Sequence, residues 1–268
     1  MRPNLVQENP VDPTKRFSNR VDNYIKYRPG YPPGIIEFFR EALGVAPGSI
    51  VADVGSGTGK LSEMLLEAGY QVTGVEPNDA MRAAAEYLLA RFPSFRSVAA
   101  KAEETTLDDA SVDLIVAGQA FHWFDQAAAK KEFERILKPG GHVALIWNDR
   151  EPDGGPMLRA YEAFLREYCP EYATATHTDV AAESLEAFFG AGRVAEVRFE
   201  NSQTLDYEGL KGRLLSCSYV PVEGPDFERL MEALPRLFDS HEKNGRVTLV
   251  YETKVFYGTA KASRGLGE

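Results

Sequence analysis

Between residues 49 and 148, apolar and polar positions alternate in blocks that predict strands followed by helices. Short apolar runs predict strands at Ile50–Val54, Gln71–Val75, Phe95–Ala99, Val112–Ala117 and His142–Trp147. Helical spacing predicts helices at Lys60–Ala68, Asp79–Arg91 and Ala127–Leu137. We expect Pro139, Gly140 and Gly141 to end the last of these helices. Such alternation is typical of a mostly parallel sheet with helices on both faces.

Two helices are predicted before this region. Phe17–Tyr27 carries apolar residues at mixed helical spacing and is followed by the turn sequence RPGYPP at residues 28–33. Ile35–Leu43 is amphipathic and is followed by Gly44 and Pro47, which close a helix. We expect residues 17–34 to form an N-terminal lid and residues 35–150 to form the core.

After Asn148 the alternation loosens. Helices are predicted at Pro156–Cys169, Ala181–Phe189, Leu205–Ser218 and Asp226–Glu242, and strands at Arg193–Thr204 and Arg246–Tyr257. We expect residues 151–192 and 205–245 to be helical cap insertions in a single domain of residues 1–268. Residues 193–204 and 246–258 then complete a seven-stranded sheet, with the final strand antiparallel at its edge.

Composition and charge narrow the class of protein. The chain has 268 residues, 44% of them hydrophobic, and a formal net charge of −10, which argues against a general nucleic-acid binder. No stretch approaches the roughly 20 apolar residues that span a bilayer, and the N-terminus lacks the apolar core of a secretory signal. Cys169 and Cys217 are too few for a disulfide framework. We expect a soluble, cytoplasmic protein that binds neither nucleic acid nor membrane; the sequence does not indicate its oligomeric state.

Residues 51–61, VADVGSGTGKL, predict a strand, a glycine-rich turn and a helix. Glycines allow a sharp turn and close approach of a ligand, and the N-terminus of the helix offers free N–H groups. A phosphate-binding P-loop would need Gly at Val54 and Ser or Thr at Leu61. The dinucleotide fingerprint would need Gly at Lys60. The pattern D-x-G-x-G-x-G remains.

Three more motifs follow in order: Glu76 at the end of the next strand, KAEE at residues 101–104, and AGQAFHWF at residues 117–124. In this order the motifs resemble those of the class I S-adenosylmethionine-dependent methyltransferases. The segment RVDNYIKYRPGYP at residues 20–32, together with QAFHWF at residues 119–124, resembles the small-molecule branch that includes trans-aconitate methyltransferase. The resemblance covers about residues 17–148, and it implies a Rossmann-like α/β fold with S-adenosylmethionine as the cofactor.

The resemblance also implies roles for single residues. Asp53 and the turn with Gly55, Ser56, Gly57 and Gly59 are expected to hold the methionine moiety, and Glu76 the ribose. Further cofactor contacts are expected from Pro77, Asn78, Met81, Ala102, Glu103, Gln119, Tyr24 and Arg28. Taken alone, each has an ordinary alternative: Asp53 as a cap, Glu76 as a solvated strand end and Met81 as a core residue.

Methyl transfer is an in-line displacement that requires alignment, exclusion of water and, for a hydroxyl or amine acceptor, removal of a proton. His122 is the candidate catalytic base, and packing beside the cofactor is its alternative role. A carboxylate acceptor would need no base, and Arg28 could then bind either that carboxylate or the carboxylate of the cofactor. The acceptor pocket is expected to include Tyr27, His122, Trp123, Trp147 and Tyr219.

The leading hypothesis is an enzyme that methylates a small molecule, on a carboxylate or hydroxyl oxygen. Two alternatives remain open. A nicotinamide-dependent oxidoreductase would also use the glycine-rich turn and Glu76, although Lys60 argues against it. A non-catalytic module could retain the cofactor pocket, since no catalytic base is unambiguous. His142, His177 and His241 are scattered along the chain, so no metal site is expected.

Overall fold

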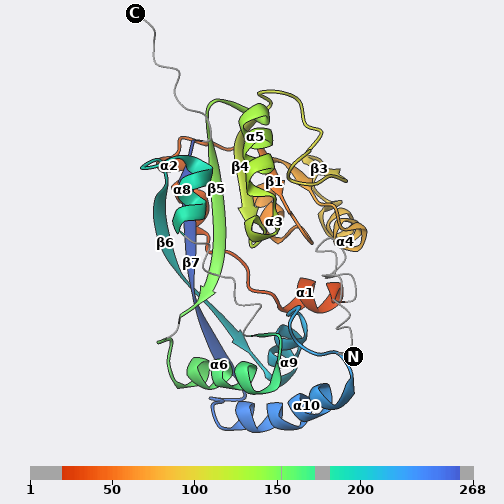
Figure 1. Cartoon of the computed structure of the whole chain (residues 1–268). Helices are drawn as coiled ribbons and strands as arrows, with labels where there is room; N and C mark the ends of the chain where they lie inside the picture. The colour runs from red at the N-terminus through yellow and green to blue at the C-terminus, as the bar shows by residue number, and fades with distance from the viewer. Residues whose placement is uncertain (1–19, 152, 173–181, 260–268) are drawn as a thin grey trace, which may run out of the picture.

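In the computed structural model, which describes residues 20–151, 153–172 and 182–259, the chain folds around one seven-stranded sheet (Figure 1). The strand order is β3-β2-β1-β4-β5-β7-β6. The strands are β1 (Ile50–Val54), β2 (Gln71–Val75), β3 (Phe95–Val98), β4 (Val112–Gly118), β5 (Leu137–Arg150), β6 (Ala195–Leu205) and β7 (Val247–Gly258). Strands β1 to β5 pair in parallel, and β7 is antiparallel to both β5 and β6. The predicted fold class is confirmed.

The antiparallel pair differs from the prediction in one respect. The sequence predicts the final strand at the edge, but β7 lies between β5 and β6, and β6 forms the edge. Strand β6 is the more exposed of the two and carries the charged residues Glu196, Arg198 and Glu200. Charged side chains on an edge strand discourage pairing with other chains, so β6 suits that position.

The helices begin and end within a few residues of their predicted bounds. They are α1 (Val21–Tyr27), α2 (Gly34–Glu41), α3 (Lys60–Glu67), α4 (Asp79–Leu89), the 3₁₀ helix η2 (Phe121–Trp123), α5 (Gln126–Ile136), α6 (Pro156–Tyr168), α8 (Ala182–Phe189), α9 (Tyr207–Leu215) and α10 (Gly224–Asp239). The predicted residues Phe17–Asn19 and Ala181 lie outside the described part of the chain. In the part that is described, no helix combines the length and apolarity needed to cross a membrane.

The end of α5 corrects one prediction. Pro139–Gly141 do not cap the helix, because α5 ends at Ile136 and Leu137 is already extended. Leu137 is buried and pairs with Val112 of β4, so β5 begins there and includes the Pro-Gly-Gly segment. The pairing of buried Leu137 with β4 therefore ends α5 before the Pro-Gly-Gly segment begins.

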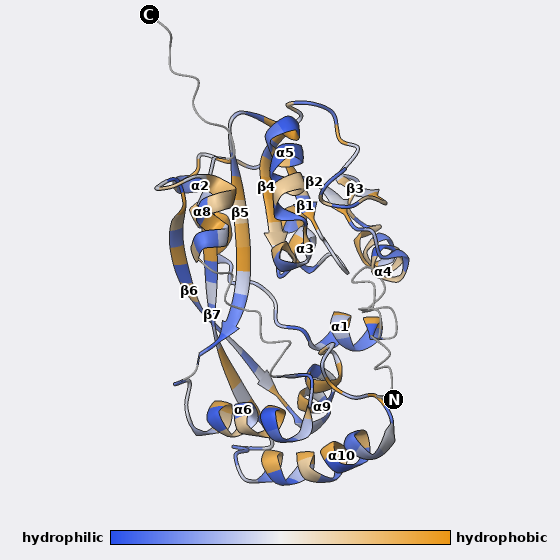
Figure 2. Ribbon diagram, viewed as in Figure 1, coloured by the Kyte–Doolittle hydropathy of each residue, from blue (hydrophilic) through white to orange (hydrophobic). Residues whose placement is uncertain are grey.

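Alternate residues of the central strands face two different cores. On one face, Ile115 and Leu145 pack with Phe133 of α5 and Phe188 of α8. The opposite face includes these residues: Val116, Ile146, Phe39 of α2, Leu65 of α3 and Leu89 of α4. Because both faces are covered, β4 and most of β5 are hydrophobic along their length (Figure 2).

A third core lies beyond the carboxyl end of the sheet, where β6 and β7 extend past the other strands (Figure 1). It contains these residues: Leu158 and Tyr161 of α6, Leu210 and Leu214 of α9, Leu230 and Leu234 of α10, and Leu249 of β7. Helices α6, α9 and α10 therefore form a cap. The segment 151–192, predicted as one cap insertion, is divided, because α8 packs on the sheet next to α5.

Candidate active site

The glycine-rich turn between β1 and α3 lies at the carboxyl end of the sheet. Gly55, Gly57 and Gly59 have φ angles of +71°, +57° and +82°, in the left-handed region that glycine adopts without steric cost. A Cβ atom at Gly55 would lie 2.5 Å from Cβ of Ala120. At Gly57 a Cβ atom would meet no atom of the described residues within 4 Å. The turn therefore packs tightly at Gly55 and is open at Gly57.

Glu76, at the end of β2, holds this turn. Its Oε2 accepts a 2.9 Å hydrogen bond from the N–H of Gly57, and its Oε1 accepts a 2.8 Å bond from the N–H of Asn78. Burial raises the pKa of the Glu76 carboxyl, and the two N–H donors partly oppose that rise. Each carboxylate oxygen has a second lone pair, so Glu76 can accept further bonds from ligand hydroxyls.

Asp53, the neighbouring carboxyl group at the end of β1, is 1% exposed. The hydroxyl of Ser62 donates a 2.6 Å hydrogen bond to its Oδ2. Within the described part of the chain, its buried Oδ1 has no hydrogen-bond partner. Burial raises the pKa of Asp53 to about 7, against the lowering effect of Ser62. Asp53 thus offers a buried acceptor that a cationic group would satisfy.

Two hollows meet at this turn. The first, which we name the Glu76 hollow, has a volume of about 500 Å³ and is lined by Gly57, Glu76, Pro77, Asn78, Met81, Ala102, Glu103, Trp123 and Phe124 among others. The second, which we name the Arg213 chamber, has a volume of about 560 Å³ and is lined by Arg28, Tyr31, Asp53, Ser56, Asn148, Arg150, Arg213 and Tyr219 among others. Tyr24, Gly55, Gly118 and Gln119 line both. A ligand in the first hollow can therefore reach into the second.

Gln119 is held at the junction in a backbone conformation that is uncommon outside glycine. Its φ angle is +58°, and its N–H donates a 2.8 Å hydrogen bond to the carbonyl of Ile146. The side-chain Nε2 donates a 3.3 Å bond to the carbonyl of Asn148. Such conformations persist where the surrounding structure enforces them, and they cluster at functional sites.

Known proteins with similar sequences share the region that contains the glycine-rich turn and Glu76. Residues 52–145, which contain the turn and Glu76, match the family model described as a methyltransferase domain. An uncharacterized methyltransferase of Mycobacterium tuberculosis is 40% identical over 140 residues, which make up 52% of this chain and 55% of that protein. Residues 52–145 therefore form a methyltransferase domain. The matched region spans only about half the length of that mycobacterial relative.

Two further similarities extend over most of the chain. An uncharacterized methyltransferase-like protein of Schizosaccharomyces pombe is 28% identical over 253 residues, covering 90% of this chain and 94% of that protein. A solved structure of a candidate type II methyltransferase from Anaeromyxobacter dehalogenans has a TM-score of 0.61 at 23% identity. It covers 87% of this chain and 98% of that chain, so the fold is shared along nearly the whole length.

S-adenosylmethionine is the cofactor of such methyltransferase domains, and the chain offers suitable groups for each part of this molecule. The unpartnered Oδ1 of Asp53 suits an ammonium group, and the buried Glu76 carboxylate suits ribose hydroxyls. Met81 and Ala102, which are 3% and 5% exposed, supply apolar surface in the Glu76 hollow for a base. The open side of Gly57 leaves room for the ligand.

Two of the predicted cofactor residues also have structural roles. Gly59 caps the N-terminus of α3 and lines neither hollow; a Cβ atom there would lie 2.7 Å from Leu89. Glu103 lines the Glu76 hollow, and its Oε1 accepts a 2.7 Å hydrogen bond from the N–H of Asp125 at the start of α5. The remaining predicted cofactor residues line one or both hollows.

The predicted acceptor residues are scattered. Trp147 is 1% exposed and packs edge-on against Phe121 and Phe256 in the core. His122 lines neither hollow; its ring lies 4.9 Å from that of Trp123, which lines the Glu76 hollow instead of the chamber. Tyr219 does line the chamber. Of the other histidines, His177 lies outside the described residues, and no group of three or more possible metal ligands occurs within them.

Helix α1 lies across the junction, in contact with both α4 and α9. Its N-cap Arg20 donates hydrogen bonds to the carbonyls of Cys217 and Val220, the latter at 2.7 Å. At its C-terminal end, Nε2 of Gln203 donates a 2.8 Å bond to the carbonyl of Tyr27. Tyr27 therefore fixes the helix and lines neither hollow, while Tyr24 of the same helix lines both.

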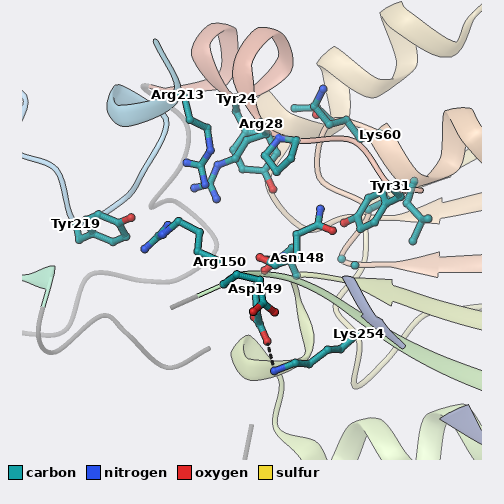
Figure 3. Close-up of a pocket in the computed structure, with 18 of the residues that line it drawn as sticks. Tyr24, Arg28, Tyr31, Lys60, Asn148, Asp149, Arg150, Arg213, Tyr219 and Lys254 are labelled. Atoms are coloured by element: carbon teal, nitrogen blue, oxygen red, sulfur yellow. Dashed lines mark hydrogen bonds and ion pairs between the residues drawn. The ribbon is translucent and has the colours of Figure 1, made fainter. Parts of the chain in front are cut away.

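The sequence analysis did not predict most of the residues that line the chamber. Strand β5 continues beyond the end of β4 and pairs there with β7 alone, which carries Asn148, Asp149 and Arg150 into the site. Figure 3 shows Arg150, Arg213, Arg28 and Tyr219 around one side of the chamber. The polar triplet after the buried run of β5 was a usable signal, and Figure 2 shows this end of β5 as hydrophilic.

Proposed function

We propose that this methyltransferase transfers a methyl group from S-adenosylmethionine to an oxygen atom of a small molecule bound in the Arg213 chamber. The chamber's volume of about 560 Å³ is in the range of small-molecule sites. It adjoins the Glu76 hollow at Tyr24, Gly55, Gly118 and Gln119. A donor in one hollow and an acceptor in the other would therefore meet at these four residues.

The charge of the chamber is the observation that carries this proposal. Although the chain has a net charge of −10, the cationic residues of the lining outnumber the acidic ones. The cationic residues are Arg28, Lys60, Arg150, Arg159, Arg166, Arg213 and Lys254, and the acidic ones are Asp53, Asp149, Glu151 and Glu162. A locally basic pocket in an acidic protein favours an anionic acceptor. Among oxygen acceptors, a carboxylate fits best.

The cofactor half of the site is proposed to work as follows. Asp53 receives the ammonium group of the methionine moiety, and the backbone of Gly55 and Gly57 lies beside it. Glu76 accepts hydrogen bonds from the ribose, and Met81 and Ala102 contact the adenine. When bound, S-adenosylmethionine supplies a methyl group already activated by its sulfonium centre.

The chain's own contribution to the reaction is alignment and exclusion of water. Helix α1 covers the junction, and Gln119 is fixed there by hydrogen bonds from its backbone and its side chain. A carboxylate oxygen is already nucleophilic, so no proton has to be removed. This agrees with the position of His122 outside both hollows, and we assign His122 a packing role beside Trp123.

We also propose that the protein acts in the cytoplasm. Cys169 and Cys217 are both free and buried, as is usual in a reducing compartment.

Incubation of the protein with methyl-labelled S-adenosylmethionine and a fractionated metabolite extract tests the function. We expect label in a small anionic product, and release of that label as methanol on mild alkaline treatment, because methyl esters hydrolyse where ethers and methylamines do not. Glu76→Ala is the control that removes the proposed ribose contact. Label only in macromolecules, or on nitrogen or carbon, would contradict the proposal.

A further inference from the structure

Among the residues that the structure describes, Arg213 is a buried cation without an acidic partner. It lies on α9, is 3% exposed and lines the chamber. Its Nη1 donates a 2.8 Å hydrogen bond to Sγ of Cys217, and its Nε donates a 3.3 Å bond to the hydroxyl of Tyr251. Nη2 has no hydrogen-bond partner among the residues that the structure describes. Because removing a charge from water is costly, a buried guanidinium is normally paired with an anion.

Two other arginines line the chamber near Arg213, and they differ in their partners: Arg150 pairs with an acidic side chain, whereas Arg28 bonds to a backbone carbonyl. Arg150 forms a 2.5 Å ion pair with Glu162 and a 2.8 Å hydrogen bond with the hydroxyl of Tyr172. Arg28 donates a 3.0 Å bond to the carbonyl of Ser216, and its buried Nε has no partner in residues 20–151, 153–172 and 182–259. Within those ranges, Glu162 is the one carboxylate in ion-pair contact with any of the three guanidinium groups.

Cys217 lies close enough to Arg213 to share its charge when ionised. Burial raises the pKa of its thiol, but the charges of Arg213, Arg28 and Arg150 and a hydrogen bond with Tyr219 lower it to about 6. A thiolate at this position would balance one guanidinium, and Glu162 balances another. The three guanidinium groups would outnumber these two anions even with Cys217 ionised, which favours an anionic ligand at the α9 end of the chamber.

We propose that the methyl acceptor carries a second anionic group, a carboxylate or a phosphate, which binds Arg213 at the α9 end of the chamber. The inference rests on the proposed function, since it assigns the same chamber to the acceptor. A guanidinium has five N–H donors in a planar fork, of which Arg213 uses two within the described protein, so it can bind such a group in bidentate fashion. The second anion would hold the acceptor while its other end reaches the junction with the Glu76 hollow. Arg213 thus selects dianionic acceptors.

Calorimetric titrations at saturating S-adenosylhomocysteine test this selection. Glutarate carries two carboxylates, 3-phosphoglycerate carries a carboxylate and a phosphate, and butyrate is the monoanionic reference. We expect at least one of these two compounds, each with two anionic groups, to bind roughly tenfold or more tightly than butyrate, as expected for one additional charged hydrogen-bonded pair. Preference for glutarate would identify a carboxylate as the second group, and preference for 3-phosphoglycerate would identify a phosphate.

Two matched variants distinguish a direct bond to Arg213 from a general attraction by the positive charge of the chamber. Arg213→Gln should abolish the preference for the dianion, while Arg166→Gln, which removes an exposed arginine of the same lining, should lower it by less than about twofold because solvent screens exposed charges. Arg213→Lys keeps the charge without the fork and should show an intermediate preference. Binding of S-adenosylhomocysteine shows that each variant is folded.

Three results would overturn the inference: dianions that bind no better than butyrate to the unmodified protein, equal losses in Arg213→Gln and Arg166→Gln, or an unchanged preference in Arg213→Gln. The first comparison needs no variant and therefore decides the matter even if Arg213→Gln does not fold. A protein that does not bind S-adenosylhomocysteine would contradict the proposed function itself. Normal cofactor binding without a dianion preference would contradict only this inference.

Discussion

The ring of Tyr27 on α1 lies directly against Gly212 on α9. A Cβ atom at Gly212 would come within 2.1 Å of two carbons of that ring, so any larger residue would displace one of the two helices. Helix α1 carries Tyr24, which lines both hollows. This contact between α1 and α9 therefore determines how α1 lies over the junction of the two hollows.

Gly212→Ala should displace α1 and weaken binding of S-adenosylhomocysteine by roughly tenfold, with a loss of unfolding free energy of about 1–3 kcal/mol from overpacking. Calorimetric titration and denaturant unfolding measure the two effects. Gly30→Ala is the matched control, because a Cβ atom there would meet nothing within 4 Å in the part of the chain that the structure describes. If Gly212→Ala binds the cofactor product as well as Gly30→Ala does, α1 does not act as a lid.

Gly118 at the junction makes room for Tyr31. A Cβ atom at Gly118 would lie 2.3 Å from the hydroxyl oxygen of Tyr31 and 3.0 Å from its Cζ. We expect Gly118→Ala to reduce methyl transfer severely and to lower stability by about 1–3 kcal/mol. Combining it with Tyr31→Phe removes the closest atom and should restore part of both losses. A double variant no better than Gly118→Ala would show that the clash is not the cause.

The buried carboxyl of Asp53 predicts a pH-dependent affinity. Its pKa is raised to about 7, so at lower pH the free protein holds it protonated and uncharged. The ammonium group of the ligand favours the ionised form, and binding should therefore release a proton. The affinity for S-adenosylhomocysteine should rise up to about tenfold per pH unit below pH 7 and level off above it. Titrations between about pH 5.5 and 8 measure this.

Asp53→Asn is the control for that titration, because it leaves Glu76 as the other buried carboxyl of the turn. Its affinity should be lower and independent of pH in the same range. In the folded protein the pKa of Asp53 lies above its value in the unfolded chain, so the free energy of unfolding falls as the pH rises from about 4 to about 7. Asp53→Asn removes this loss and should therefore stabilise the ligand-free protein above about pH 4. An equal pH slope in Asp53→Asn would assign the titration to another group.

Local signals made most of the core predictable. The strands β1 and β2 have their predicted bounds because their apolar runs are short and end at turns. The glycine-rich turn was recognisable for a similar reason, since its φ angles are imposed within five consecutive residues. Trp147 could also have been placed, because it shares its side of β5 with Val143 and Leu145, both of which are core residues.

The chamber was not predictable in the same way. Arg150 at the end of β5 and Arg213 on α9 come together only because β6 and β7 extend beyond the sheet and carry the cap. A pattern of neighbouring residues in the sequence does not predict that two such distant segments come together. His122 illustrates a different limit: its motif placed it after β4, but the single turn of η2 decides where its ring points. Spacing in the sequence does not determine that direction.

Calorimetric titration with S-adenosylhomocysteine tests most directly whether the turn at Gly55–Gly59 and Glu76 hold the cofactor. We expect the unmodified protein to bind the compound and Glu76→Gln to bind it roughly ten- to hundredfold more weakly, as expected for the loss of a charged acceptor. Glu86→Gln, which changes an exposed carboxylate on α4, should leave the affinity unchanged. Absence of binding to the folded protein, or equal affinities for all three proteins, would contradict the account.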